Sequence, residues 1–109
     1  MKISFDEIEE TVIENFYGGE GTIVSNLTVV NGNKIMRGHL DPGCSIGTHT
    51  HTDACETIFI LTGIGKAICD GVEESLSAGD CHHCPCGSTH ELSNTGDSPL
   101  EFYAVVAKQ

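Results

Sequence analysis

The stretch GTHTHTDACETIF, residues 47–59, carries side chains whose types and spacing suit a metal site. His49 and His51 are two residues apart, so on an extended strand both side chains project from the same face. Glu56 follows the turn residues TDAC and opens a new strand, which can bring its carboxylate to the two imidazoles across a hairpin. His90 follows the turn PCGST and opens another strand. Three neutral imidazoles and one carboxylate would make a mixed nitrogen and oxygen site for a divalent metal.

Spacing alone leaves a second interpretation open, in which these are ordinary solvated surface side chains. The residues around the histidines carry more information, because they form a block with regular spacing. Five residues separate Gly43 from His49, four separate His51 from Glu56, and six separate Glu56 from Gly63. A glycine beyond a strand is typical of a turn that needs backbone freedom, so this block predicts a strand, a turn, a strand and a second turn.

A second block with defined spacing contains the third histidine. Five residues separate Gly79 from Pro85, one separates Pro85 from Gly87, two separate Gly87 from His90, and three separate His90 from Asn94. The proline and the second glycine predict a sharp turn just before His90. Asn94 is expected to hydrogen-bond loop backbone and not to contact a metal.

The two blocks together resemble the two signature motifs of the cupin superfamily at every defining position, over roughly residues 40–105. The resemblance implies an all-β fold, a small antiparallel β-barrel of the double-stranded β-helix or jelly-roll type. It also implies that one divalent metal, of which Fe, Mn, Ni, Zn, Co and Cu are all compatible, binds to His49, His51, Glu56 and His90. One or two coordination positions would stay open for water or substrate.

Short strands are the elements that must position these residues. From residue 21 onward, short segments alternate with turns rich in Gly, Asn, Asp and Pro, such as NGN and DPG. This pattern predicts an antiparallel sandwich or small barrel, and helices long enough for parallel crossovers are absent from it.

The one predicted helix lies near the N-terminus. Ser4 and Glu7 fit a capping box, Phe5, Ile8 and Val12 would share one helical face, and the pattern ends by Gly18–Gly19. We therefore expect a single cupin domain over residues 1–109, with an N-terminal helical arm at 1–20 and a barrel core at 40–105.

Composition and charge exclude several classes of function. The chain has 16 acidic and five basic residues, a formal net charge of −11, which repels nucleic acid and anionic membranes. The first residues, MKISFDEIEE, do not resemble a signal peptide, and no apolar run approaches the length of a membrane span. We expect a cytoplasmic protein that binds neither nucleic acid nor membrane.

Six cysteines raise the question of disulfides. Without an export signal, reduced thiols are the expected state. The segment DCHHCPCG, residues 80–87, contains a CxxC pair, but on a strand Cys81 and Cys84 would point to opposite faces. We expect the cysteines of this segment to act as small apolar core groups.

The histidines of the same segment, His82 and His83, are the candidate catalytic residues. On a strand only one of them can face the cavity, where it would support the metal ligands or donate a proton, and the sequence does not say which. Met36, Arg37 and His39 precede the first motif and are candidates for lining the pocket. Arg37 would then bind an anionic substrate, or else be a surface charge.

The function implied by the resemblance is metal-dependent chemistry on a small oxygenated molecule such as a sugar or keto acid, with isomerase, lyase and dioxygenase activities all compatible. The alternative is a non-catalytic module that binds or senses a small molecule through the metal. Exposed edge strands in so small a β protein predict a homodimer, with the N-terminal segment and residues 22–30 at the interface.

Overall fold

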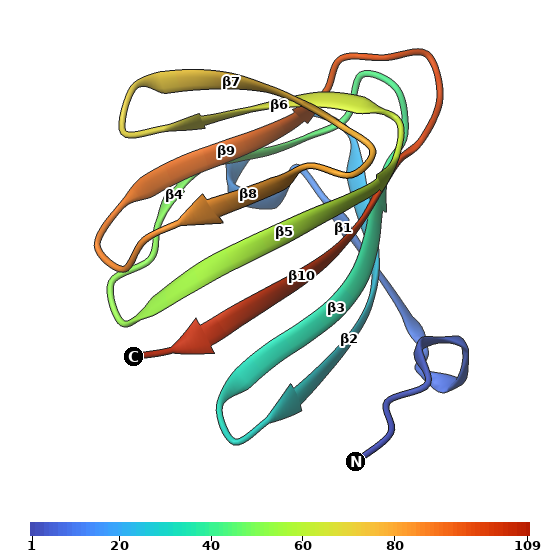
Figure 1. Cartoon of the computed structure of the whole chain (residues 1–109). Coiled ribbons are helices and arrows are strands. Elements are labelled where there is room, and N and C mark those ends of the chain that lie inside the picture. The colour runs from blue at the N-terminus through green and yellow to red at the C-terminus, as the bar shows by residue number, and fades with distance from the viewer.

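Two antiparallel sheets face each other in the computed structural model, which describes residues 1–109 (Figure 1). The larger sheet has six strands in the order β1 (Glu10–Glu14), β2 (Thr22–Val30), β3 (Asn33–Leu40), β10 (Leu100–Lys108), β5 (Ala54–Thr62) and β8 (Cys81–Cys84). The smaller sheet has four, in the order β4 (Ser45–Thr50), β9 (Thr89–Asn94), β6 (Ile64–Cys69) and β7 (Val72–Ser77). The predicted all-β cupin-type architecture is confirmed.

Turn chemistry accounts for the hairpins. Asn31 and Gly32 both have positive φ, 51° and 82°, as do Asp70 and Gly71, 49° and 82°. Asn-Gly and Asp-Gly tolerate this left-handed conformation, which matches the twist of the flanking strands in a two-residue hairpin. The dipeptides therefore set the register of β2 with β3 and of β6 with β7.

The space between the sheets is filled by side chains from alternate strand positions. On β5 and β10 the even-numbered residues point inward, as the alternation of buried and exposed residues shows. The resulting core contains Ile23, Leu40, Ile46, Ile58, Ile60, Ala67, Leu76, Leu92, Leu100, Phe102 and Ala104.

The predicted N-terminal helix is wrong. Residues Phe5–Glu7 form a single 3-10 turn (η1), and the chain then runs as strand β1, which pairs with β2 from Glu10↔Asn26 to Glu14↔Thr22. An isolated helix of this length is marginal in water, whereas three consecutive β-branched residues, 11–13, favour a strand. Hydrogen bonding to the free edge of β2 makes this segment a strand and not a helix.

A second 3-10 turn, η2 (Phe16–Gly18), lies between β1 and β2 and contacts β4. The first turn lies against the larger sheet (Figure 1). There the rings of Phe5 and Tyr103, on the outer face of β10, stack with centroids 5.5 Å apart. The predicted arm is thus built into the sheet and against the barrel wall.

A bulge interrupts the pairing of β4 with β9. Ile46 pairs with Leu92, but His49 pairs with His90, so β4 contains one residue more than its partner between these pairs. Ile46 is in the core and His49 lines the same interior cavity, although they are three positions apart. Strict alternation would place them on opposite faces, so the bulge is what turns His49 inward.

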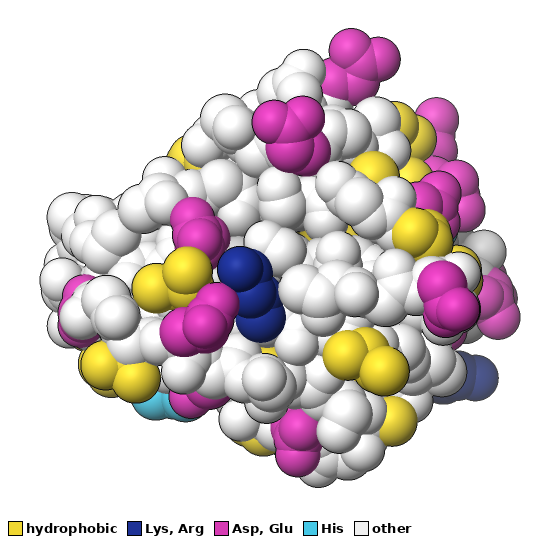
Figure 2. Space-filling view, turned by 90° about the horizontal axis from the view of Figure 1, so that it is seen from above, with side chains coloured by type: hydrophobic (Ala, Val, Ile, Leu, Met, Phe, Trp, Pro, Cys, Tyr) yellow, Lys and Arg dark blue, Asp and Glu magenta, His cyan; other side chains and the backbone are white.

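The outer surface is acidic. Seen from above, acidic side chains are spread over the molecule and hydrophobic ones form small separated groups (Figure 2). None of the helical segments has the length and apolar character needed to span a bilayer.

Candidate metal centre

Three imidazoles and one carboxylate converge inside the barrel. The Nε2 atom of His90 is 3.0 Å from Nε2 of His49 and 3.1 Å from Nε2 of His51. The Glu56 Oε1 atom is 2.9 Å from Nε2 of His90 and 3.1 Å from Nε2 of His51. One ligand atom from each of the four residues therefore lies within 4.8 Å of all the others.

Four segments supply these side chains. His49 comes from the end of β4, His51 from the residue after it, Glu56 from β5 and His90 from β9. Because His49 and His90 are directly paired across β4 and β9, their side chains are neighbours on one face of the smaller sheet. Glu56 faces them from the larger sheet, so the site spans the space between the two sheets.

For two of the four residues, His49 and Glu56, the surroundings favour the protonation state that a metal requires. Burial lowers the pKa of His49 below its ordinary value, against the opposing hydrogen bond to the Gly47 carbonyl. Burial by itself would raise the pKa of Glu56, but hydrogen bonds and charges from His90 and His51 bring that pKa below its ordinary value. Neutral imidazoles and an ionised carboxylate are the forms that bind metals.

The ring nitrogens of His49 and His90 that point away from the site have partners of their own. His49 Nδ1 donates to the Gly47 carbonyl at 2.8 Å. His90 Nδ1 lies 3.0 Å from Nε2 of His82, whose Nδ1 in turn hydrogen-bonds the Glu74 carboxylate. Partners of this kind orient imidazoles toward a metal, so the donor set and its surroundings fit a divalent cation.

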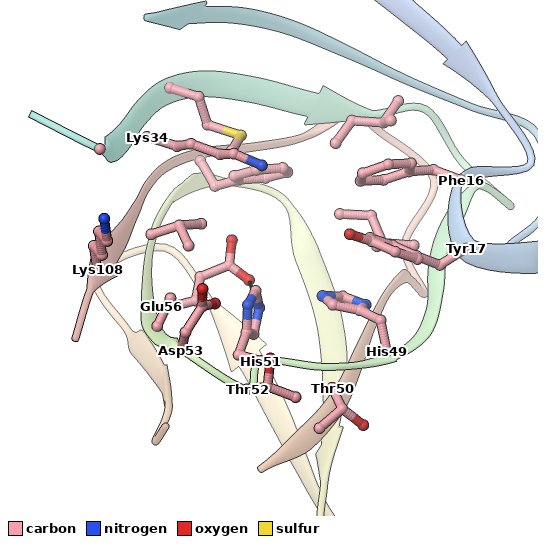
Figure 3. Close-up of a pocket in the computed structure, with 17 residues that line it drawn as sticks. Phe16, Tyr17, Lys34, His49, Thr50, His51, Thr52, Asp53, Glu56 and Lys108 are labelled. Carbon is pink, nitrogen blue, oxygen red and sulfur yellow. Dashed lines mark hydrogen bonds and ion pairs between the residues drawn. The ribbon is translucent and has the colours of Figure 1, made fainter. Parts of the chain in front are cut away.

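A cavity of about 400 Å³ opens beside the cluster. Figure 3 shows His49 and Tyr17 on one side of it and Lys34 and Lys108 toward the other. The Tyr17 ring stacks on the His49 ring, with centroids 4.2 Å apart and planes inclined by 12°. Apolar wall is supplied by Phe16, Ile23, Met36, Ile46, Ala54, Phe102 and Val106. A small molecule with a polar end and a compact body matches this lining.

The structure separates the two candidate catalytic histidines. His82 is buried in the barrel interior, behind His90 and outside the cavity lining, whereas His83 is exposed and contacts the Thr57 hydroxyl at 3.0 Å. His82 is therefore the inward-facing member of the pair, but neither histidine reaches a molecule in the cavity. Their catalytic role stays a prediction that the geometry does not favour.

Other expected pocket residues divide between the two faces of the larger sheet. Met36 lines the cavity, while Arg37 and His39 lie at a separate polar depression on the outside. Arg37 bonds to Asp6 at 2.8 Å, so it is a surface charge and not an anion ligand of this cavity.

All six cysteines are free thiols in the structure. The expectation of core packing holds for Cys84, which is completely buried, but Cys81 and Cys86 are exposed. Burial raises the pKa of Cys84 to about 12, so its thiol stays neutral and acts as a small apolar group.

Four residues of the site escaped the reading of the sequence. The sequence predicts a helical arm around Tyr17, and no motif marks Lys34, Lys108 or Glu74. The alternation of β3 and β10 places Lys34 in register with Val106 and on the inner face. The alternation of β3 and β10 is readable from the sequence. The contact of Tyr17 with His49 joins segments distant in sequence, and the contact of Glu74 with His82 depends on how strands of opposite sheets meet.

Comparison with known proteins agrees with this geometry. The family model described as "Cupin domain" matches residues 36–106. An oxalate-binding protein of Thermotoga maritima is 33% identical over 97% of this chain and 93% of its own length. A crystal structure of a predicted oxalate decarboxylase, also from Thermotoga maritima, has a TM-score of 0.93 with 31% identity and covers 100% of both chains.

A more distant structure is similar in fold alone. A sugar phosphate isomerase from Silicibacter pomeroyi has a TM-score of 0.78 at 22% identity, covering 100% of this chain and 76% of that one. At this level of identity the similarity describes the barrel and not the chemistry.

Proposed function

This chain belongs to the cupin family, and on that premise we propose that it binds one divalent metal and, beside it, a small carboxylate anion. The metal ligands would be His49, His51, Glu56 and His90. The convergence of these four donors at the side of a cavity is the observation that carries the proposal. A divalent cation held there supplies positive charge to the oxygen of a bound molecule.

The choice of an anion is supported by the lysines of the cavity. The chain has only five basic residues, and Lys34 and Lys108 both line this cavity. Lys34, Val106 and Glu56 share one row across β3, β10 and β5. With strands about 4.8 Å apart, the Lys34 backbone is about 10 Å from that of Glu56, so its ammonium reaches an anion next to the donors.

The similarity to a protein named for oxalate binding supports the same class of ligand. A dicarboxylate of that size would contact the metal with one end and the lysines with the other. The apolar wall formed by residues such as Phe16 and Phe102 then limits the length of the bound molecule. Oxalate is accordingly the first ligand to test.

The metal assignment is tested by elemental analysis of the purified protein and by its thermal unfolding with and without a chelator. Wild type should contain one metal per chain, and its unfolding midpoint should fall when the metal is removed, because a ligand of the native state stabilises it. The His49→Ala, His51→Ala double variant should contain no metal, and the chelator should leave its unfolding midpoint unchanged. Metal retained in the double variant would contradict the assignment.

The anion assignment is tested by calorimetry with oxalate. Lys34→Met should weaken binding to the metal-loaded protein about tenfold, because it removes one charge-assisted contact and keeps the side-chain stem. Lys66→Met is the matched control, since Lys66 lies on the smaller sheet and pairs with Glu73 at 3.2 Å. Equal affinities of the two variants would exclude a role for Lys34.

Turnover of the bound carboxylate is the second candidate function. Asp53, on the loop between His51 and Glu56, lines the cavity and is a carboxylate outside the four-donor cluster. Its carboxylate would exchange a proton with a bound molecule. Incubation of metal-loaded protein with ¹³C-oxalate decides between binding and turnover, and Asp53→Asn should abolish any product while preserving binding.

A further inference from the structure

A chain of three side chains leads from the four-donor cluster to the surface. Glu74 comes from β7, an edge of the smaller sheet, and His82 comes from β8, an edge of the larger one. The Glu74 carboxylate hydrogen-bonds His82 Nδ1, and His82 Nε2 is 3.0 Å from His90 Nδ1. His82 is 1% exposed, whereas the Glu74 side chain is 47% exposed. This row of three hydrogen-bonded side chains therefore crosses the barrel wall where the two sheet edges meet.

The position of each proton in this chain follows from the chemistry of imidazole. A neutral imidazole carries one N–H, and the nitrogen that binds a metal must present its lone pair. His90 directs Nε2 at Glu56 and the other histidines, and a metal bound there would take the Nε2 lone pair in place of the hydrogen bond to Glu56. In that metal-binding form the proton of the neutral His90 ring belongs on Nδ1. His82 must then accept at Nε2 and carry its own proton on Nδ1, where Glu74 accepts it.

Glu74 determines the direction of hydrogen-bond donation, from His90 through His82, because an ionised carboxylate accepts hydrogen bonds and cannot donate them. Without that acceptor, His82 is free to carry its proton on Nε2 and donate to His90 Nδ1. His90 would then carry its proton on Nε2, which is the atom required for the metal. The carboxylate thus excludes the tautomer that blocks the site.

We propose that Glu74 and His82 are positioning residues that hold His90 in its metal-binding tautomer and so set the affinity of the site. The inference rests on the proposed function, since it concerns the metal assigned there. The tautomer of His49 is held in the same way by the Gly47 carbonyl, which also can only accept a hydrogen bond. For His90 the hydrogen-bonding partners are the side chains of His82 and Glu74, which substitution can remove.

The test compares Glu74→Gln with Glu73→Gln. Both residues lie on β7 and both substitutions remove one negative charge, but Glu73 pairs with Lys66 and is outside the chain of histidines. A glutamine at position 74 can donate as well as accept, so it permits the wrong tautomer. Affinity for Zn²⁺, measured by competition with a chromophoric chelator, should fall about tenfold in Glu74→Gln and stay at the wild-type value in Glu73→Gln.

A second comparison uses the adjacent histidines. His82→Gln should weaken Zn²⁺ binding, whereas His83→Gln should not, because His83 contacts only the exposed Thr57 hydroxyl. Urea denaturation of each variant shows whether it is folded. Equal Zn²⁺ affinities within both pairs would overturn the proposal.

A spectroscopic measurement tests the tautomer itself. In ¹⁵N NMR of the metal-free wild type, His82 should carry its proton on Nδ1 and present a bare Nε2; a proton on Nε2 would overturn the proposal. The same spectrum of Glu74→Gln should show a mixture. If the His49→Ala, His51→Ala variant loses its metal while Glu74→Gln matches Glu73→Gln, only this inference fails. If that double variant keeps its metal, the proposed ligand set fails, and the NMR result still decides the tautomer.

Discussion

Asn94, at the end of the second motif, shows what one side chain contributes away from the site. Its Nδ2 donates to the carbonyls of Leu40 and Ser98, each at 2.8 Å, and its Oδ1 accepts from the Gly96 amide at 2.9 Å. It thereby ties the loop after β9 to the end of β3. This is the loop-backbone role expected from its position in the second motif.

Replacement of Asn94 by alanine should destabilise the fold by about 1–3 kcal/mol, because buried backbone groups lose their partners. Urea denaturation measures the change. Asn33→Ala is the control, since it removes a single solvent-accessible hydrogen bond to the Lys108 amide. Equal losses in the two variants would argue against the role assigned to Asn94.

At the scale of elements, the bulge in β4 and the turn η2 form one unit. A Cβ atom at Gly47 would lie 2.1 Å from the Tyr17 carbonyl oxygen, so the glycine permits η2 to rest directly on the bulge. That contact places the Tyr17 ring over His49, whose Nδ1 donates to the Gly47 carbonyl. The orientation of His49 therefore depends on a segment more than 30 residues earlier in the chain.

Substitution of Gly47 by alanine should push η2 away from β4, lower the free energy of unfolding by about 1–3 kcal/mol and weaken metal binding. Both effects are measurable, by urea denaturation and by Zn²⁺ competition. Gly96→Ala is the matched control, because a Cβ there meets nothing closer than 3.4 Å. A Gly47→Ala protein with wild-type stability and affinity would contradict the coupling of η2 to the site.

For the whole molecule, charge and strand edges are the informative features. Acidic residues dominate a surface of net charge −11, yet two of the five basic side chains line the one cavity that contains the donors. Placing scarce positive charge there favours entry of an anion that the rest of the surface repels. The edge strands are β1, β8, β4 and β7. Of residues 22–30, predicted to lie at an interface edge, β1 covers residues 22–26.

A homodimer remains the prediction for the assembled state, with β1 in place of β2 as the N-terminal edge that is free to pair. Sedimentation equilibrium should give twice the 11.6 kDa of one chain. Replacing Val12, which is 59% exposed on β1, with lysine should then shift the protein toward monomer. A wild-type mass of 11.6 kDa at all concentrations would contradict the prediction.

The sequence by itself determined the identity of the four converging residues and most of the strands. Turn dipeptides such as Asn31-Gly32 and the period-two alternation act over a few residues, so they are readable without a fold. The spacing around His49, His51, Glu56 and His90 predicted one cluster, and the structure brings these residues together. Local signals failed at the N-terminus, where pairing with β2 outweighed a weak helical pattern.

Only the tertiary structure decided which way the site faces and what surrounds it. Alternation shows that His49 and His51 share a face, but the bulge after Ile46 is what makes that face the interior. Likewise, His82 became the inward residue of its pair, with Glu74 beyond it, because two sheet edges meet there. Such contacts join separate strands, in part from opposite sheets, and their partners are fixed by packing of the whole barrel and not by local propensity.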